Sequence, residues 1–290
     1  MGQGFCRTLT ILLAGFAGVC LPAAAQTRPV AIVTDVQGRA VVQRGGQPVR
    51  IALLTELADG EEVEVAQGTR LVAVLYWPGN EYAVSGFSRV RFTVAALEPL
   101  AGVAPQRRDM PADMRLNPSG LVQAGVQMRS VARPTIVTVH PVGVRVLDAL
   151  PEFRWQPVDG VREYEFSLSG ESGGTLFAAR TTEPRIALPA TQPLAPGLRY
   201  AWRVRASDAN GRESSGIAAF FTASEQLAAD VKRLQPPAAA AVERWVTYAL
   251  WLRQERLHAE ADRVWQRVQA LRPDDTGVRA MLASGEGGSR

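Results

Sequence analysis

The clearest pattern in the chain is an alternation of apolar and polar side chains over residues 194–211, which read LAPGLRYAWRVRASDANG. The turn-forming tripeptide Ala195-Pro196-Gly197 precedes the alternation, and Asp208-Ala209-Asn210-Gly211 ends it. Between these turns every second residue is apolar: Tyr200, Trp202, Val204 and Ala206. A period of two with one apolar face predicts a long, half-buried β-strand.

Two predicted strand segments upstream supply further aromatic residues. Trp155 lies in one of them, and Tyr164 and Phe166 alternate with polar residues in the other. A core tryptophan on one sheet and a tyrosine near the start of a long strand of the other are typical of a β-sandwich of about 100 residues. Residues 134–222 therefore resemble the fibronectin type III and related immunoglobulin-like families, and this resemblance implies a β-sandwich.

Short alternating runs separated by turn signals also fill residues 26–97. Valines alternate with glutamates over 61–65, and Gly45-Gly46 is a hairpin signal. Residues 69–77 are apolar on both faces, which predicts a central strand of a sheet. The pattern therefore predicts an all-β domain.

The order of these pieces resembles the FecR-like domain. The matching segments are GRAVV at 38–42, LADGEEV at 57–63, GTRLVAVL at 68–75 and PGNEYAV at 78–84. The resemblance implies an exported, non-catalytic module that passes signals or binds partners in the cell envelope. After this domain, residues 98–133 contain several prolines and weak periodicity, and we interpret them as a linker that holds one strand at most, over 121–131.

Helical periodicity begins after the predicted sandwich, and we expect a helical tail over 223–285 followed by a disordered end at 286–290. Thr222-Ala223-Ser224-Glu225 has the spacing of a capping box. Pro236-Pro237 interrupts the first helix, and two helices of high propensity are predicted over 238–255 and 258–271, with a short third helix after them.

The two longer helices resemble a single tetratricopeptide repeat. A unit of about 34 residues read from Val242 places the signature residues at the expected spacings. These residues are Trp245, Tyr248, Ala249, Leu252, Ala261, Trp265 and Pro273. Because at least three such repeats are normally needed for independent stability, we expect the hairpin to pack on the sandwich, on its flanking helices or on another protein. The face formed by Trp245, Tyr248 and Trp265 is then either core or a docking groove.

Residues 1–25 have the features of a secretory signal peptide and predict a periplasmic protein. Arg7 provides a short positive region, an apolar run follows it, and Ala23-Ala24-Ala25 forms a small-residue cleavage site. Cys20 raises the alternative of a lipoprotein, but Val19 before it suits lipidation poorly. Both cysteines would leave with the signal, so we expect neither disulfides nor thiolate metal sites in the mature chain. No later stretch is long and apolar enough to predict an integral membrane segment.

The charge balance of the chain argues against a nucleic-acid-binding function. The full sequence has 32 basic and 28 acidic residues, a net charge of +4. The high isoelectric point arises because arginine replaces lysine at all positions but Lys232. A nucleic-acid-binding domain usually shows a stronger and more clustered excess of positive charge.

The polar face of the 199–206 strand is the main candidate binding surface. Arg199, Arg203 and Arg205 share this face and would contact anionic groups of a partner, a glycan or a lipid. The alternative is a solvated sheet face on which the arginines pair with Glu163 and Glu165 of a neighbouring strand.

No catalytic, cofactor-binding or metal-binding motif accompanies these features. His140 and His258 are not spaced with carboxylates as metal ligands are, and the motifs of nucleophile elbows, phosphate loops and zinc peptidases are absent from the sequence. We therefore expect a mainly β, non-enzymatic protein without cofactor. Its predicted role is that of an interaction or scaffold protein of the bacterial envelope with a protein partner, and the alternative is a peptidoglycan- or glycan-binding module.

Overall fold

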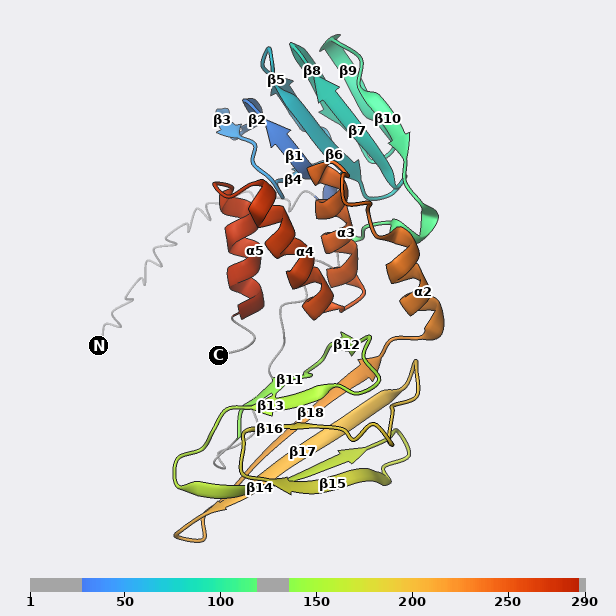
Figure 1. Ribbon diagram of the computed structural model, residues 1–290. Coiled ribbons are helices and arrows are strands. Elements are labelled where there is room, and N and C mark those ends of the chain that lie inside the picture. The colour runs from blue at the N-terminus through green and yellow to red at the C-terminus, as the bar shows by residue number, and fades with distance from the viewer. Residues whose placement is uncertain (1–27, 119–135, 287–290) are drawn as a thin grey trace, which may run out of the picture.

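The computed structural model describes residues 28–118 and 136–286. The predicted signal peptide and the predicted strand at 121–131 lie outside the described residues, as do residues 287–290. The chain is mainly β, with antiparallel sheets in two separate β units and helices at the C-terminal end. Figure 1 shows the helices between the two β units, with the first β unit on one side and the sandwich on the other. The predicted fold class is therefore confirmed.

The first β unit consists of two five-stranded antiparallel sheets that enclose an apolar core. One sheet has the order β10-β7-β6-β1-β4 and comprises β1 (Pro29–Gln37), β4 (Glu56–Ala58), β6 (Arg70–Leu75), β7 (Asn80–Ser85) and β10 (Gln106–Asp109). The other has the order β3-β2-β5-β8-β9 and comprises β2 (Ala40–Arg44), β3 (Gln47–Arg50), β5 (Glu62–Val65), β8 (Ser88–Phe92) and β9 (Leu97–Gly102). Inward side chains of both sheets, among them Leu57, Leu71 and Phe92, form one buried cluster.

The first β unit extends beyond the predicted boundary at residue 97. Strand β9 pairs with β8, and β10 pairs with β7, so two segments of the predicted linker complete the two sheets. Gly102 ends β9 with a positive φ of 83°, and its Cα lies against the backbone of Phe87, where a side chain would clash. The prolines in this region suggested a linker, but Pro99 lies in the outermost strand of its sheet, where a missing N–H is tolerated.

The second β unit is a two-sheet sandwich. One sheet has the order β11-β13-β16 and comprises β11 (Thr138–His140), β13 (Glu152–Trp155) and β16 (Arg185–Ala187). The other has the order β12-β18-β17-β14-β15 and comprises β12 (Arg145–Val146), β14 (Val161–Ser169), β15 (Thr175–Thr181), β17 (Arg199–Asp208) and β18 (Glu213–Thr222). Strand β12 pairs in parallel with β18, and the other pairings are antiparallel.

The aromatic residues that the sequence places in the sandwich form its core. Trp155 and Trp202 come from opposite sheets and lie with ring centroids 6.2 Å apart, and Phe166 contacts both. Tyr200 lies near the start of β17, and its hydroxyl accepts a hydrogen bond from the N–H of Ala195 at 3.0 Å. This back-bond to the preceding corner is the tyrosine corner of immunoglobulin-like sandwiches. The alternation over 199–206 therefore predicted both the strand and its buried face.

The C-terminal part contains four helices in its described residues. They are α2 (Glu225–Leu234), α3 (Val242–Gln254), α4 (His258–Leu271) and α5 (Thr276–Glu286). The N-cap of α2 is Ser224, whose hydroxyl accepts from the N–H of Leu227 at 3.1 Å. The predicted capping box starting at Thr222 is therefore wrong, because Thr222 still belongs to β18 and its hydroxyl donates to the carbonyl of Ala195 at 2.7 Å.

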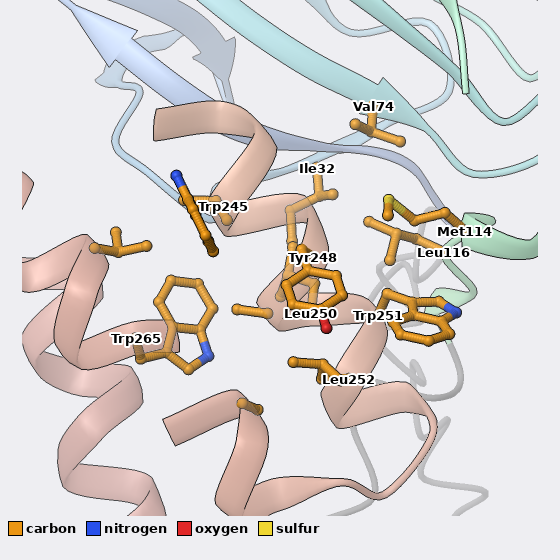
Figure 2. Packing of buried hydrophobic residues seen from close by; sticks show 14 of the residues in the cluster. Ile32, Val74, Met114, Leu116, Trp245, Tyr248, Leu250, Trp251, Leu252 and Trp265 are labelled. Carbon is orange, nitrogen blue, oxygen red and sulfur yellow. The ribbon is translucent and has the colours of Figure 1, made fainter. Parts of the chain in front are cut away.

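The helices pack on the outer face of the first β unit. Their buried side chains share one cluster with Ile32 of β1, Val74 of β6 and Leu116, which follows β10 (Figure 2). This packing explains why residues 69–77 are apolar on both faces. Alternate side chains of β6 face the core between the two sheets, and Val74 on the other face lies under the helices.

Candidate interaction surface

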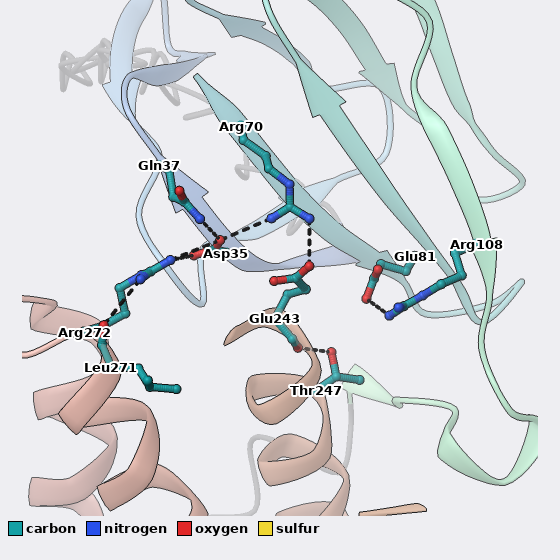
Figure 3. Close-up of polar contacts among 9 residues, drawn as sticks. All are labelled: Asp35, Gln37, Arg70, Glu81, Arg108, Glu243, Thr247, Leu271 and Arg272. Atoms are coloured by element: carbon teal, nitrogen blue, oxygen red, sulfur yellow. Dashed lines mark hydrogen bonds and ion pairs between the residues drawn. The ribbon is translucent and has the colours of Figure 1, made fainter. Parts of the chain in front are cut away.

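Charged side chains join the helices to the first β unit at the edge of their apolar contact (Figure 3). Nη2 of Arg70 lies 2.7 Å from Oε1 of Glu243, and its Nη1 lies 3.4 Å from Oδ2 of Asp35. Arg272 at the end of α4 reaches Oδ1 of Asp35 at 3.3 Å. The Asp35 and Glu243 side chains are only 2% and 5% exposed. These ion pairs therefore fix the helices on β1 and β6.

A second ion pair lies beside this group. Nη2 of Arg108 in β10 is 2.7 Å from Oε2 of the buried Glu81 in β7. Burial raises the pKa of Glu81 above its ordinary value, and the charge of Arg108 opposes this rise without cancelling it. A cavity of about 260 Å³ next to the pair is lined by both residues and by the end of α2. Of its charged lining residues, Glu81, Arg108 and Arg233 are already paired within the chain, which makes the cavity a weak candidate for an ionic ligand.

The structure corrects the hypothesis of a helical docking face. Trp245, Tyr248 and Trp265 are 3%, 3% and 0% exposed, because α3 and α4 bury them against each other and against the first β unit. The hydroxyl of Tyr248 donates to the carbonyl of Val231 at 2.8 Å, and the guanidinium of Arg267 covers the Trp245 ring at 4.2 Å. These three residues therefore form core, and they offer no open groove to another protein.

The predicted arginine positions lie on the outer face of the sandwich. Arg199, Arg203 and Arg205 are all exposed and point away from the core, and we call this surface the arginine face. Within the described residues, none of the three forms an ion pair or a hydrogen bond through its side chain. The neighbouring Glu165 lies opposite Arg205 in the register but pairs with Arg180 of β15, at 2.8 Å.

A hollow of about 440 Å³ lies on the arginine face over β14. Its lining comprises Glu165, Phe166, Ser167, Ala178, Ala179, Arg180, Arg203 and Arg205. The hollow exists because small side chains lie between long ones: Ser167 and Ala178 occupy the row that crosses the sheet from Arg203. Three guanidinium groups against one carboxylate give this hollow a positive charge, which favours an anionic ligand.

Sequence reasoning did not identify Arg180. The residue belongs to the hollow only because β15 pairs with β14 and places it opposite Glu165. The apolar run over 176–179 could have predicted a strand, but the sequence there does not alternate and indicates neither the face that Arg180 occupies nor its neighbours. The pairing of Arg180 with Glu163 and Glu165, at 3.4 and 2.8 Å, also leaves the β17 arginines without the partners that the solvated-face alternative requires.

The two histidines lie apart from this surface. Burial lowers the pKa of His140, and nearby Arg154 adds to the effect. Burial likewise lowers the pKa of His258, helped by the charge of Arg253. Over residues 28–118 and 136–286, no three histidine, cysteine or acidic side chains gather in a way that would hold a metal ion. Within the same ranges, every helix is too short or too polar to cross a bilayer.

Comparison with known proteins yields only distant structural similarity. No family model and no curated protein matches the sequence significantly. The chain is similar to CopC from Methylosinus trichosporium OB3b, with 18% identity, a TM-score of 0.26 and coverage of 31% of this chain and 95% of CopC. It is also similar to the fibronectin type III domain of human fibronectin type III domain containing protein 3, with 12% identity, a TM-score of 0.23 and coverage of 40% and 100%.

A two-domain fibronectin type III segment of chicken tenascin covers a larger share of the chain. It has 14% identity and a TM-score of 0.22, and the match covers 67% of this chain and 86% of the segment. Such similarities carry no functional argument. The chain has distant structural similarity to fibronectin type III and immunoglobulin-like sandwich domains, in agreement with its own tyrosine corner.

Proposed function

We propose that this protein is an exported, non-catalytic interaction protein of the bacterial envelope that binds an acidic partner protein through the arginine face. The observation that carries the proposal is that Arg203 and Arg205 are exposed beside a hollow and have no ion-pair partner among the described residues. Unpaired guanidinium groups on a rigid sheet are pre-organised for carboxylates, because none of their donors is engaged by the part of the chain that the structure describes.

The first β unit and the helices support a more specific family proposal. We infer that the first unit is FecR-like, because its turn glycines Gly38, Gly68 and Gly79 adopt positive φ between successive strands as the resembling segments require. We also infer that α3 and α4 are a tetratricopeptide-like hairpin, because Ala261 and Trp265 are buried at the signature positions. The FecR-like resemblance is to envelope modules that transmit signals or bind partners, which suits a role in periplasmic signalling or assembly.

Export to the periplasm is the part of the proposal that depends on residues 1–25. The charged start, the apolar run and the alanines before Gln26 support cleavage after Ala25. Mass spectrometry of the protein recovered from the periplasm should find Gln26 at the N-terminus. A lipid-modified Cys20 at the N-terminus would instead establish the lipoprotein alternative, and an intact chain in the cytoplasm would contradict export.

Site-specific photo-crosslinking in the producing cells tests the binding function. A photoreactive residue replaces Ile217, which is 61% exposed and lies opposite Arg203 in β18. We expect a crosslinked protein partner that disappears in the charge-reversal variant R203E/R205E. The matched control is R50E/R89E, which reverses two exposed arginines of the first β unit and should keep the crosslink. The same crosslink yield in both double variants would refute a role for the arginine face.

A glycan-binding function is the alternative, since carboxylate and phosphate groups of envelope polymers would also pair with free guanidinium groups. Sedimentation with purified peptidoglycan distinguishes the two. Retention on peptidoglycan that R203E/R205E abolishes and R50E/R89E preserves would favour the glycan function over a protein partner.

A further inference from the structure

We propose that the acidic partner binds as an extended segment that adds a strand to the open edge of the sandwich at β15. This inference rests on the proposed function, because it names the way in which the same partner docks. Strand addition supplies main-chain hydrogen bonds for affinity, while side-chain contacts supply specificity.

The two edges of the five-stranded sheet are treated differently by the fold. At one edge, β12 has only two residues, and the turn between α3 and α4 binds it. The N–H of Arg145 donates to the carbonyl of Arg256 at 2.9 Å, and its guanidinium pairs with Glu255 at 2.9 Å. At the other edge, β15 has seven residues and pairs only with β14. A long edge strand without a cover is a template for pairing with another chain.

The outer side of β15 is open from Phe177 to Thr181. In an antiparallel edge strand, every second residue directs its N–H and C=O away from the sheet. Within the described part of the chain, β14 alone pairs through its backbone with residues 177–181. The Thr181 hydroxyl bonds to the backbone of Glu183 and Arg185, and the Gln192 amide donates weakly to the Leu176 carbonyl at 3.4 Å. The strand has no proline and one charged residue, Arg180, so it has few of the features that protect natural edges.

The charges beside this edge specify an acidic strand. An added strand would lie about 4.8 Å beyond β15. Its side chains on the outer face would lie next to Ala178 and Arg180, at the rim of the hollow. Because Ala178 and Ser167 are small, a glutamate of the added strand could extend over them toward Arg203. Arg203 and Arg205 would then gain the carboxylate partners that residues 28–118 and 136–286 do not provide.

The chain's own remaining segments do not suit this position. Residues 1–27, 119–135 and 287–290 contain no aspartate or glutamate, and each includes at least one arginine. A segment without acidic residues would bring further positive charge to the arginine face. Charge complementarity therefore favours a partner protein over a segment of this chain as the occupant.

Binding of synthetic peptides to the purified mature protein tests the inference. The probe is acetyl-EVEVEVEV-amide carrying a fluorophore, and its affinity is measured by fluorescence anisotropy. Two control peptides are acetyl-EPEPEPEP-amide, which has the same charge but cannot donate the strand hydrogen bonds, and acetyl-KVKVKVKV-amide, which has the opposite charge. We expect the EV peptide to bind about tenfold or more tightly than either control, because it alone combines both features.

Proline variants separate edge pairing from charge. Of the adjacent residues Ala178 and Ala179, one N–H faces β14 and the other faces outward, so A178P and A179P should differ in thermal stability. The variant that loses the N–H facing β14 should melt at a lower temperature, and the variant that loses the outward N–H should keep the wild-type melting temperature. This second variant should weaken binding of the EV peptide about tenfold. A187P on the edge strand β16 of the other sheet is the matched control and should bind normally.

Hydrogen exchange of the β15 amides provides a second readout. Bound EV peptide should slow exchange of the outward amides in residues 177–181. Equal binding of the EV and EP peptides, lost in R203E/R205E but unaffected by the proline variants, would overturn the edge inference and leave the proposed function standing. Failure of every acidic peptide to bind would overturn both. Protection of these amides without peptide, or β15-dependent dimers in sedimentation, would show the edge already covered and would also overturn the inference.

Discussion

The ion pair between Arg70 and Glu243 allows a sharp test of how the helices are held on the first β unit. The Glu243 side chain is 5% exposed and pairs with Arg70. The Arg70 side chain is 39% exposed and also pairs with Asp35. Replacing Arg70 with methionine leaves a buried carboxylate without its ion-pair partner. Such a change costs about 3–5 kcal/mol in a fully buried pair. Because Arg70 is partly exposed, solvent screening reduces this cost, and we expect about 2–3 kcal/mol for R70M.

Replacing the other partner, Glu243, should cost less stability. In E243M the remaining guanidinium keeps Asp35 and contact with water, so we expect a loss of about 1 kcal/mol. In R70M/E243M no charge of the pair is left uncompensated, and Asp35 retains Arg272 and Gln37. We therefore expect the double variant to be more stable than R70M, with a total loss of about 1 kcal/mol.

Native-state hydrogen exchange measures these effects locally. The amides of α3 should exchange roughly 30 to 150 times faster in R70M than in wild type, which corresponds to the expected loss of stability. The amides of β17 in the sandwich are the internal control and should keep their rates. Equal effects of R70M and E243M, or a double variant as unstable as the sum of the two, would refute the reasoning that the buried carboxylate sets the cost.

The same pair predicts a dependence on pH. Burial alone would raise the pKa of Glu243, but the hydrogen bond and the charge of Arg70 outweigh it and hold the pKa below its ordinary value. The stability from this carboxylate is therefore complete above the unfolded pKa of about 4.3 and is lost as the pH falls through the lower folded-state pKa. As the pH is lowered, the stability calculated from hydrogen exchange of the α3 amides should fall in wild type, and E243Q should lack this contribution.

Three further variants test other parts of the fold. W265A removes a side chain that is 0% exposed and should cost about 3–5 kcal/mol in urea unfolding of the helices, and a loss below about 1 kcal/mol would contradict its place in the core. G102A places a side chain at positive φ against the Phe87 backbone and should cost about 2–3 kcal/mol in urea unfolding of the first β unit, whereas an unaffected first unit would contradict the assignment of β9 to it. The lowered pKa values of His140 and His258 mean that stability is full above about pH 6.5 and falls as the pH drops toward the folded-state values. The melting temperature of H140Q/H258Q should therefore change less between pH 7 and pH 5 than that of wild type, and identical pH profiles would contradict the prediction.

The local pattern of the sequence determined the long strand over 199–206 and the face that it buries, whereas it missed β9 and β10 in the predicted linker. Tyr200 and Trp202 entered the core because a strand directs alternate side chains to opposite faces, a property that needs no knowledge of the partner strands. The same alternation placed Arg203 and Arg205 on the outer face. Their surroundings did not follow, because Arg180 and Glu165 come into contact only through the order of strands in the sheet.

Only the tertiary structure decided where the helices pack. The apolar stripe with Trp245 and Trp265 showed that the helices need a partner surface, and the sequence left the sandwich, the flanking helices and another protein as alternatives. The structure confirms the flanking helices, since Val231 of α2 and Val278 of α5 belong to the same buried cluster. It adds a surface that the sequence did not name, on which Ile32 and Val74 lie more than 150 residues away in the chain. The two-sided apolar pattern of residues 69–77 indicated that such a cover exists. Hydrophobic burial is non-directional, so a pattern can state that a face is buried, and only the folded chain shows what buries it.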